Sequence, residues 1–89
     1  MAVLHITYKP NPDTADAAYE GFCNVLKSYR SIRLSQSNWA IHTVEPPKAV
    51  WQKLKDYIYP DEYLVMLPLD ARLWTSQDRK ALQFILGRP

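Results

Sequence analysis

Apolar residues alternate with other residues near the start of the chain. Leu4, Ile6 and Tyr8 occupy every second position, and this period of two places them on one face of a strand. Residues 37–44 alternate in the same way, and residues 31–35 form a shorter segment of the same kind. Residues 63–67 are a continuous apolar run, which is typical of a strand buried in a sheet. The pattern therefore predicts four strands, over residues 2–8, 31–35, 37–44 and 63–67.

Between these strands the apolar residues recur at steps of three and four, which is the period of a helix. One stripe consists of Ala15, Ala18, Tyr19, Phe22, Leu26 and Tyr29. Gly21 lies within it and weakens a helix by about 1 kcal/mol relative to alanine. A second helix begins at Pro46 and Pro47, because proline is favoured in a first helical turn. The residues that this helix directs inward are predicted to be Val50, Trp51, Leu54, Tyr57 and Ile58.

A third helix is predicted near the end of the chain, over residues 75–87. Thr75 and Asp78 have the spacing of a capping box, and Gly87 suits a helix end. The elements then follow the order β-α-β-β-α-β with one helix appended. Right-handed crossovers place the first two helices on one face of an antiparallel sheet with strand order 4-1-3-2. We therefore expect an α+β fold, a ferredoxin-like plait, in a single domain over residues 1–89.

The sheet face without these two helices is partly apolar. A chain of 89 residues has a limited core, so covering such a face with a second copy would stabilise it. We therefore predict a homodimer. Its expected interface residues are Val3, His5, Thr7, Ala40, His42, Val44 and Trp74.

Composition narrows the classes of function. The residues are 47% hydrophobic and 22% charged, which is typical of a globular domain. Only 2 glycines argue against a glycine-rich phosphate loop, and 1 cysteine excludes an internal disulfide and a zinc site built on cysteines. A net charge of +2 is too small to indicate nucleic-acid binding by itself. With a lone Cys23, no signal-like start and no long apolar run, we expect a cytoplasmic protein without a membrane partner.

Three segments resemble one known family. The first strand, LHITY, ends in Tyr8, and the segment SQSNWAIHT carries a Ser-x-Trp motif at Ser37 and Trp39. The run DEYLVMLPL is followed by Trp74. In these features the chain resembles the small CRISPR-associated Cas-two proteins and their VapD-like and SinR-type relatives, over most of residues 2–75. The resemblance implies the same plait and a homodimer.

The position after Tyr8 departs from that family. Family members with metal-dependent nuclease activity carry an aspartate there, where this chain has Lys9. A carboxylate holds Mg²⁺ and an ammonium repels it, so we expect no metal, no cofactor and no nuclease chemistry. Asp13 and Asp16 lie beyond two prolines and are not obvious replacements.

Two sets of side chains are candidates for binding or chemistry. Four cations near the ends of predicted elements are candidates for nucleic-acid contact, since phosphate contact needs only such charges: Lys9, Lys27, Arg30 and Arg33. His5 and His42 share a sheet face but lack a third metal ligand, and Cys23 lacks a neighbouring base. We interpret these three as packing or interface residues.

These observations favour a non-enzymatic, homodimeric binding or assembly module with nucleic acid as a candidate ligand. One alternative is a divergent VapD-type endoribonuclease that uses other carboxylates. The other is a small mobile-element or phage protein that binds a host protein.

Overall fold

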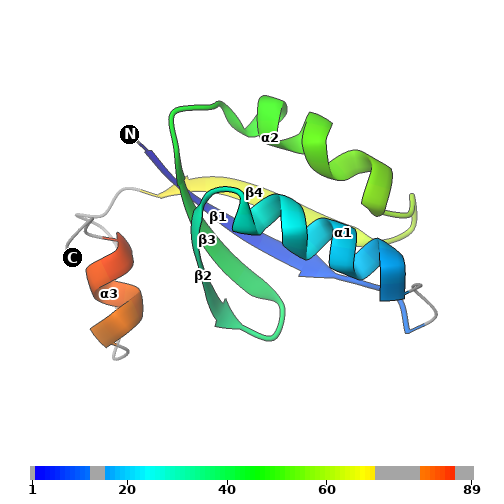
Figure 1. Cartoon of the computed structure of the whole chain (residues 1–89), viewed down its shortest axis with the longest axis horizontal. Coiled ribbons are helices and arrows are strands. Elements are labelled where there is room, and N and C mark those ends of the chain that lie inside the picture. Colours follow the sequence, from blue (N-terminus) through cyan, green and yellow to red (C-terminus); the bar gives the residue numbers. More distant parts are fainter. Residues whose placement is uncertain (1, 13–15, 70–78, 86–89) are drawn as a thin grey trace.

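The computed structural model describes residues 2–12, 16–69 and 79–85, and the following elements are placed within them (Figure 1). In chain order they are β1 (Ala2–Lys9), α1 (Asp16–Lys27), β2 (Arg30–Ser35), β3 (Asn38–Thr43), α2 (Pro47–Leu54), the short 3₁₀ helix η1 (Lys55–Tyr57), β4 (Tyr63–Leu69) and α3 (Arg79–Ile85). Pro10 follows β1 and Pro46 caps the start of α2, because proline lacks the N–H that a strand or helix interior needs.

The four strands form one antiparallel sheet with the order β2-β3-β1-β4. β1 lies inside the sheet, where Leu4 is opposite Ile41 of β3 and Pro68 of β4. This order is the predicted order 4-1-3-2 viewed from the other edge. The predicted α+β class with a four-stranded antiparallel sheet is thus confirmed.

One face of the sheet packs against α1 and α2. Phe22 of α1 lies between Tyr8 and Trp39, with ring centroids 4.4 and 5.3 Å from its own. The other buried members of this core are Leu4, Ile6, Leu26, Ile41, Val50 and Leu54. Within β1 the core residues are two positions apart, and within α1 and within α2 they are four positions apart. The two periodicities therefore identified these core-facing positions correctly.

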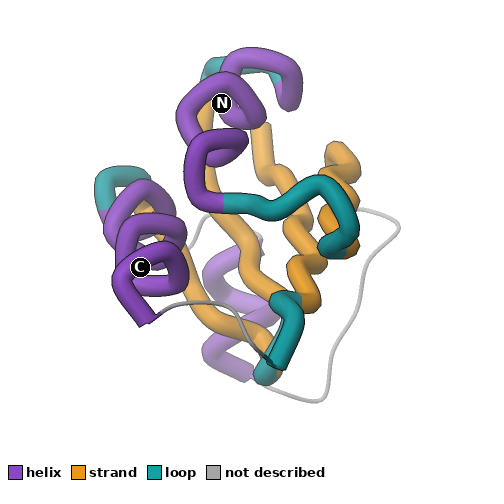
Figure 2. Tube along the Cα trace, turned by 90° about the vertical axis from the view of Figure 1, so that its right-hand side faces the viewer, coloured by secondary structure: helices purple, strands orange, loops and turns teal. Residues whose placement is uncertain are grey.

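The opposite face of the sheet packs against α3. Phe84 and Ile85 of α3 form a second buried cluster with Val3 and Ala40. Figure 2 shows the same molecule turned by 90°, with the helices in purple around the orange strands. The predicted third helix is therefore present over Arg79–Ile85, and residues 75–78, 86 and 87 lie outside the described part of the chain.

Two predictions about burial are wrong. Trp51 was expected to face the core, yet its side chain is 36% exposed, because Val50 and Leu54 already form the buried stripe of this short helix. The apolar run of β4 was expected to be buried, but Tyr63 and Leu67 are each 54% exposed, since β4 occupies the edge position that the predicted strand order gave it. An edge strand has a neighbour on one side alone, so part of an apolar run on it stays exposed.

α1 and η1 approach each other closely at Gly21. A Cβ atom at this position would overlap the ring of Tyr57, which packs against the main core. Gly21 therefore has a packing role that compensates for its low helix propensity.

Candidate binding groove

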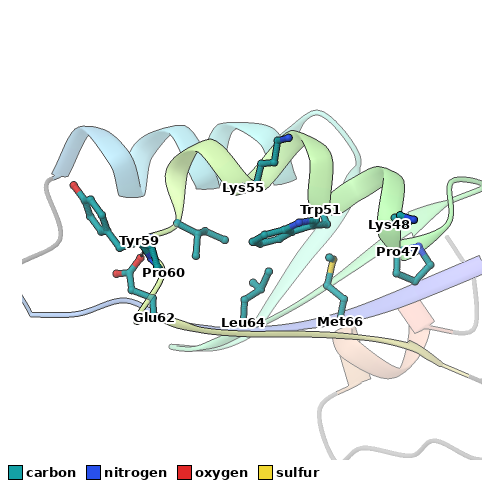
Figure 3. A pocket seen from close by; sticks show the side chains of 10 residues that line it. Pro47, Lys48, Trp51, Lys55, Tyr59, Pro60, Glu62, Leu64 and Met66 are labelled. Atoms are coloured by element: carbon teal, nitrogen blue, oxygen red, sulfur yellow. Dashed lines mark hydrogen bonds between the residues drawn. The ribbon is translucent and has the colours of Figure 1, made fainter.

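A cavity of about 720 Å³ opens between the α2–η1 segment and β4 (Figure 3). We call it the α2–β4 groove. Its lining comprises Pro47, Lys48, Trp51, Lys55, Ile58, Tyr59, Pro60, Glu62, Leu64 and Met66. The groove follows from the edge position of β4, since β4 has a strand neighbour, β1, on one side only among the described residues.

The walls of the groove are mainly apolar. Leu64 and Met66 point from β4 toward α2, and the Trp51 ring lies over them (Figure 3). Both β4 side chains are only partly buried against the core. Tyr59, 46% exposed, stands at the η1 end of the groove. The groove thus exposes two aromatic side chains above an apolar floor.

Glu62 holds the turn that forms one end of the groove. Its Oε1 accepts hydrogen bonds from the Tyr8 hydroxyl and the Tyr59 backbone N–H, each at 2.8 Å. Its Oε2 accepts a 2.7 Å hydrogen bond from the Asn11 backbone N–H. One carboxylate therefore joins the end of β1 to the turn that precedes β4.

The upper rim of the groove is cationic. Lys48, Trp51 and Lys55 are separated by three and four positions, so they follow one face of the α2–η1 segment. Within the described residues neither lysine forms an ion pair. The one lining carboxylate, Glu62, already accepts three hydrogen bonds from the protein.

Lys53 lies on another face of α2 and has partners. Its Nζ is 2.9 Å from Glu45 Oε1 and donates a 3.0 Å hydrogen bond to the Tyr29 hydroxyl. The Lys53 hydrogen bond holds the pKa of Glu45 below its usual value, and the hydrogen bonds with Tyr29 and Glu45 raise the pKa of Lys53. Burial raises the pKa of Tyr29. This cluster ties α2 to the loops that flank β2 and β3.

Of the four candidate nucleic-acid-binding cations, Arg33 is the most firmly held. Its guanidinium donates to the carbonyls of Ser35 and Gln36 at 3.2 and 2.8 Å and to the Tyr19 hydroxyl at 3.2 Å. It also lies 5.1 Å from the ring centroid of Trp39. Arg33 and Lys27 both line a cavity of about 340 Å³ beside α1.

The other two cations lie on the opposite sheet face. Lys9 is opposite Tyr63, and its Nζ is 5.7 Å from the centroid of that ring. Arg30 lies 5.7 Å from the Phe84 ring of α3. Lys9 and Arg33 nevertheless both border one polar cavity of about 410 Å³. The structure therefore divides the four cations between two faces.

The predicted dimer-interface residues are largely on the face that α3 contacts. Val3 and Ala40 are buried there, and the Nε2–H of His42 donates to the Phe84 carbonyl, with the two rings 4.5 Å apart. His5 and Thr7 are half-buried, Val44 follows β3 and is exposed, and Trp74 is outside the described residues. The interface itself stays a prediction.

Two other candidates for chemistry have ordinary surroundings. Cys23 is a half-buried free thiol that packs against the main core. Burial, with a contribution from Cys23, raises the pKa of Tyr19. In the part of the chain that the structure describes, no three His, Cys, Asp or Glu side chains are grouped so that they could hold a metal ion.

The chain matches no protein-family model, no curated protein and no solved structure. None of the helices in the described ranges is long and apolar enough to cross a membrane.

The groove is the feature that sequence reasoning missed. A signal for it was present in the sequence, because Trp51 shares a helical face with Lys48 and Lys55, whose charged groups favour solvent. A tryptophan between two lysines at helical spacing indicates a partly exposed aromatic residue rather than a core residue.

Proposed function

We propose that this protein is a non-enzymatic binding module that holds a segment of a partner protein in the α2–β4 groove. The strand order and the two helices on one sheet face support a ferredoxin-like plait as the scaffold. The observation that carries the proposal is the exposed Trp51 over an apolar floor at an open sheet edge.

Tryptophan and tyrosine are the residues that most often dominate binding energy at protein interfaces, especially in concave apolar sites. Trp51 and Tyr59 both stand in this groove. A volume near 720 Å³ has room for a few partner side chains.

The arrangement of charge favours a protein partner over nucleic acid as the main ligand. Backbone phosphates require several cations along one surface, whereas the four candidates meet only in pairs, Lys9 with Arg33 at one cavity and Lys27 with Arg33 at another. Homodimerisation, nucleic-acid contact and the VapD-type alternative stay predictions that separate experiments can address.

A capture experiment with matched variants tests the proposal. Tagged wild-type protein, Trp51→Ala and Gln52→Ala are incubated with nuclease-treated lysate of the source cells. Gln52 is an exposed neighbour on α2 outside the groove and serves as the control. We expect proteins that wild type and Gln52→Ala retain and Trp51→Ala does not.

Folding of each variant is verified by urea unfolding, since Trp51 is partly exposed and its loss should leave the core intact. Equal retention by folded wild type and Trp51→Ala would refute the groove as the binding site. The same capture is repeated with untreated lysate, and retention seen only there would favour nucleic acid instead.

A further inference from the structure

Among the described residues no strand pairs with the outer edge of β4, and the backbone of β4 offers hydrogen-bonding groups at this open edge. The Tyr8 N–H donates to the Ser37 carbonyl at 2.9 Å, on the β3 side of β1, so Tyr8 directs its backbone groups away from β4. Tyr8 and Leu64 are therefore a non-hydrogen-bonded pair, and so are Ile6 and Met66 two residues along. It follows that Leu64 and Met66 direct their N–H and C=O groups toward the open edge.

The same two residues form the floor of the α2–β4 groove. We infer that the occupant of the groove is an extended acidic peptide that pairs with β4 as a fifth strand, an inference that rests on the proposed function. Strand addition of this kind draws its affinity from backbone hydrogen bonds and its specificity from alternate side chains.

The sheet geometry determines which peptide side chains enter the groove. Residues directly opposite each other in a sheet have side chains on the same face. A peptide residue opposite Met66 or Leu64 therefore points toward Trp51. The groove at that level is lined by Leu64, Met66 and the largely apolar ring of Trp51, so an apolar side chain fits there.

The two lysines on the rim determine what flanks this apolar residue. Lys48 stands near the Met66 end of the groove and Lys55 farther along toward the Leu64 end (Figure 3). At about 1.5 Å per helical residue they lie about 4.5 and 6 Å along the axis from Trp51. Alternate residues of a strand are about 6.8 Å apart, which is slightly more than the spacing from Trp51 to either lysine. Flexible lysine side chains span this small difference in spacing. The pattern that fits is acidic–x–apolar–x–acidic.

Pro68 sets the limit of the pairing surface. It has the same backbone direction as Met66 but has no N–H to donate. The edge therefore offers complete donor–acceptor pairs at Leu64 and Met66 and only a carbonyl at Pro68. A short peptide segment is sufficient to occupy it.

A second copy of this chain fits the groove less well than an acidic peptide. If β4 paired with its own copy about a twofold axis, the lysine rims of both copies would face the same shared groove. Four like charges would then oppose association, and within the described residues Lys48 and Lys55 have no ion-pair partner to neutralise them.

The test uses a short, capped, fluorescent peptide in which glutamate, leucine and glutamate alternate with threonine. Its affinity is measured by fluorescence anisotropy at low salt. One control peptide carries lysine in place of both glutamates, and another carries an N-methyl group on the leucine, which removes one backbone donor. The protein variants are Lys48→Glu with Lys55→Glu, and the control Gln52→Glu on the same helix.

We expect the acidic peptide to bind wild type and Gln52→Glu alike, and the lysine peptide to bind about tenfold more weakly. The double charge reversal should invert this preference, and N-methylation should abolish binding. Amide exchange at Leu64 and Met66 should slow when the acidic peptide is present.

Failure of strand addition is distinguishable from failure of the proposed function. Equal affinity for the N-methylated peptide, or no binding of the acidic peptide, would overturn strand addition even if partner capture still depends on Trp51. Concentration-dependent dimerisation that Trp51→Ala abolishes would assign the groove to a second copy instead.

Discussion

Replacing Gly21 by alanine tests the close approach of α1 and η1. Alanine is favoured over glycine within a helix by about 1 kcal/mol, so propensity alone predicts a more stable protein. The new methyl group, however, would overlap the Tyr57 ring. Overpacking of this kind costs about 1–3 kcal/mol. Tyr57 packs against the main core, so moving its ring aside would lose core contacts. We therefore expect Gly21→Ala to lower the free energy of unfolding by about 1–2 kcal/mol.

Urea unfolding followed by far-ultraviolet circular dichroism measures this change. For a domain of this size the midpoint should fall by about 1 M. Asn24→Ala, at an exposed position of the same helix, is the control and should raise stability by about 0.5 kcal/mol. In a Tyr57→Ala background the sign should reverse, so that Gly21→Ala stabilises. If Gly21→Ala stabilises the otherwise unchanged protein, the close approach of these helices is refuted.

Three further predictions concern the core beneath α2, the Glu62 carboxylate and the ion pair between Lys53 and Glu45. Leu54→Ala should lower the free energy of unfolding by about 2–5 kcal/mol, because it leaves a cavity beneath α2, and urea unfolding measures the loss. Glu62→Ala removes an acceptor shared by three donors and should cost about 2–4 kcal/mol, while Tyr8→Phe should cost only about 1 kcal/mol; equal costs in unfolding experiments would contradict the shared carboxylate. The pKa of Glu45 is lowered, so its stabilising contribution is present above the usual carboxyl range and is lost as pH falls through the lowered pKa. The pKa of Lys53 is raised, so its contribution is present below 10.5 and is lost as pH rises through the raised pKa. The stability difference between wild type and Lys53→Met should therefore shrink at both pH extremes, and a difference independent of pH would argue against the ion pair.

The sequence predicted the sheet well because its strands alternate. A period of two at Leu4, Ile6 and Tyr8 specifies a face whatever the neighbours are, and those three side chains are buried as expected. The strand order followed from chain connectivity, since few topologies suit this order of elements.

The predicted strand order placed β4 at the sheet edge, but the sequence did not indicate how much of its apolar run stays exposed there. A continuous apolar run such as residues 63–67 is typical of a buried strand, and the run by itself does not show which of its side chains a neighbouring element covers. For Trp51 the two lysines at helical spacing were a signal of partial exposure, but an aromatic residue at the border of a helical stripe lines a groove only where the neighbouring elements leave one open. The groove is therefore a property of the assembled fold.

The position of β1 in the sheet also determines the order in which the chain can fold. β2 and β3 are joined by a tight turn and can pair early. The contacts of β1 are distant in sequence: Thr7 and Asn38 are 31 residues apart, and Tyr8 and Glu62 are 54 apart. Non-local pairings of this kind form late because closing long loops costs entropy. During synthesis from the N-terminus, the first strand is made before either of its partners. It completes its pairing only after β4 has left the ribosome, and until then at least one of its edges is open to association with other chains.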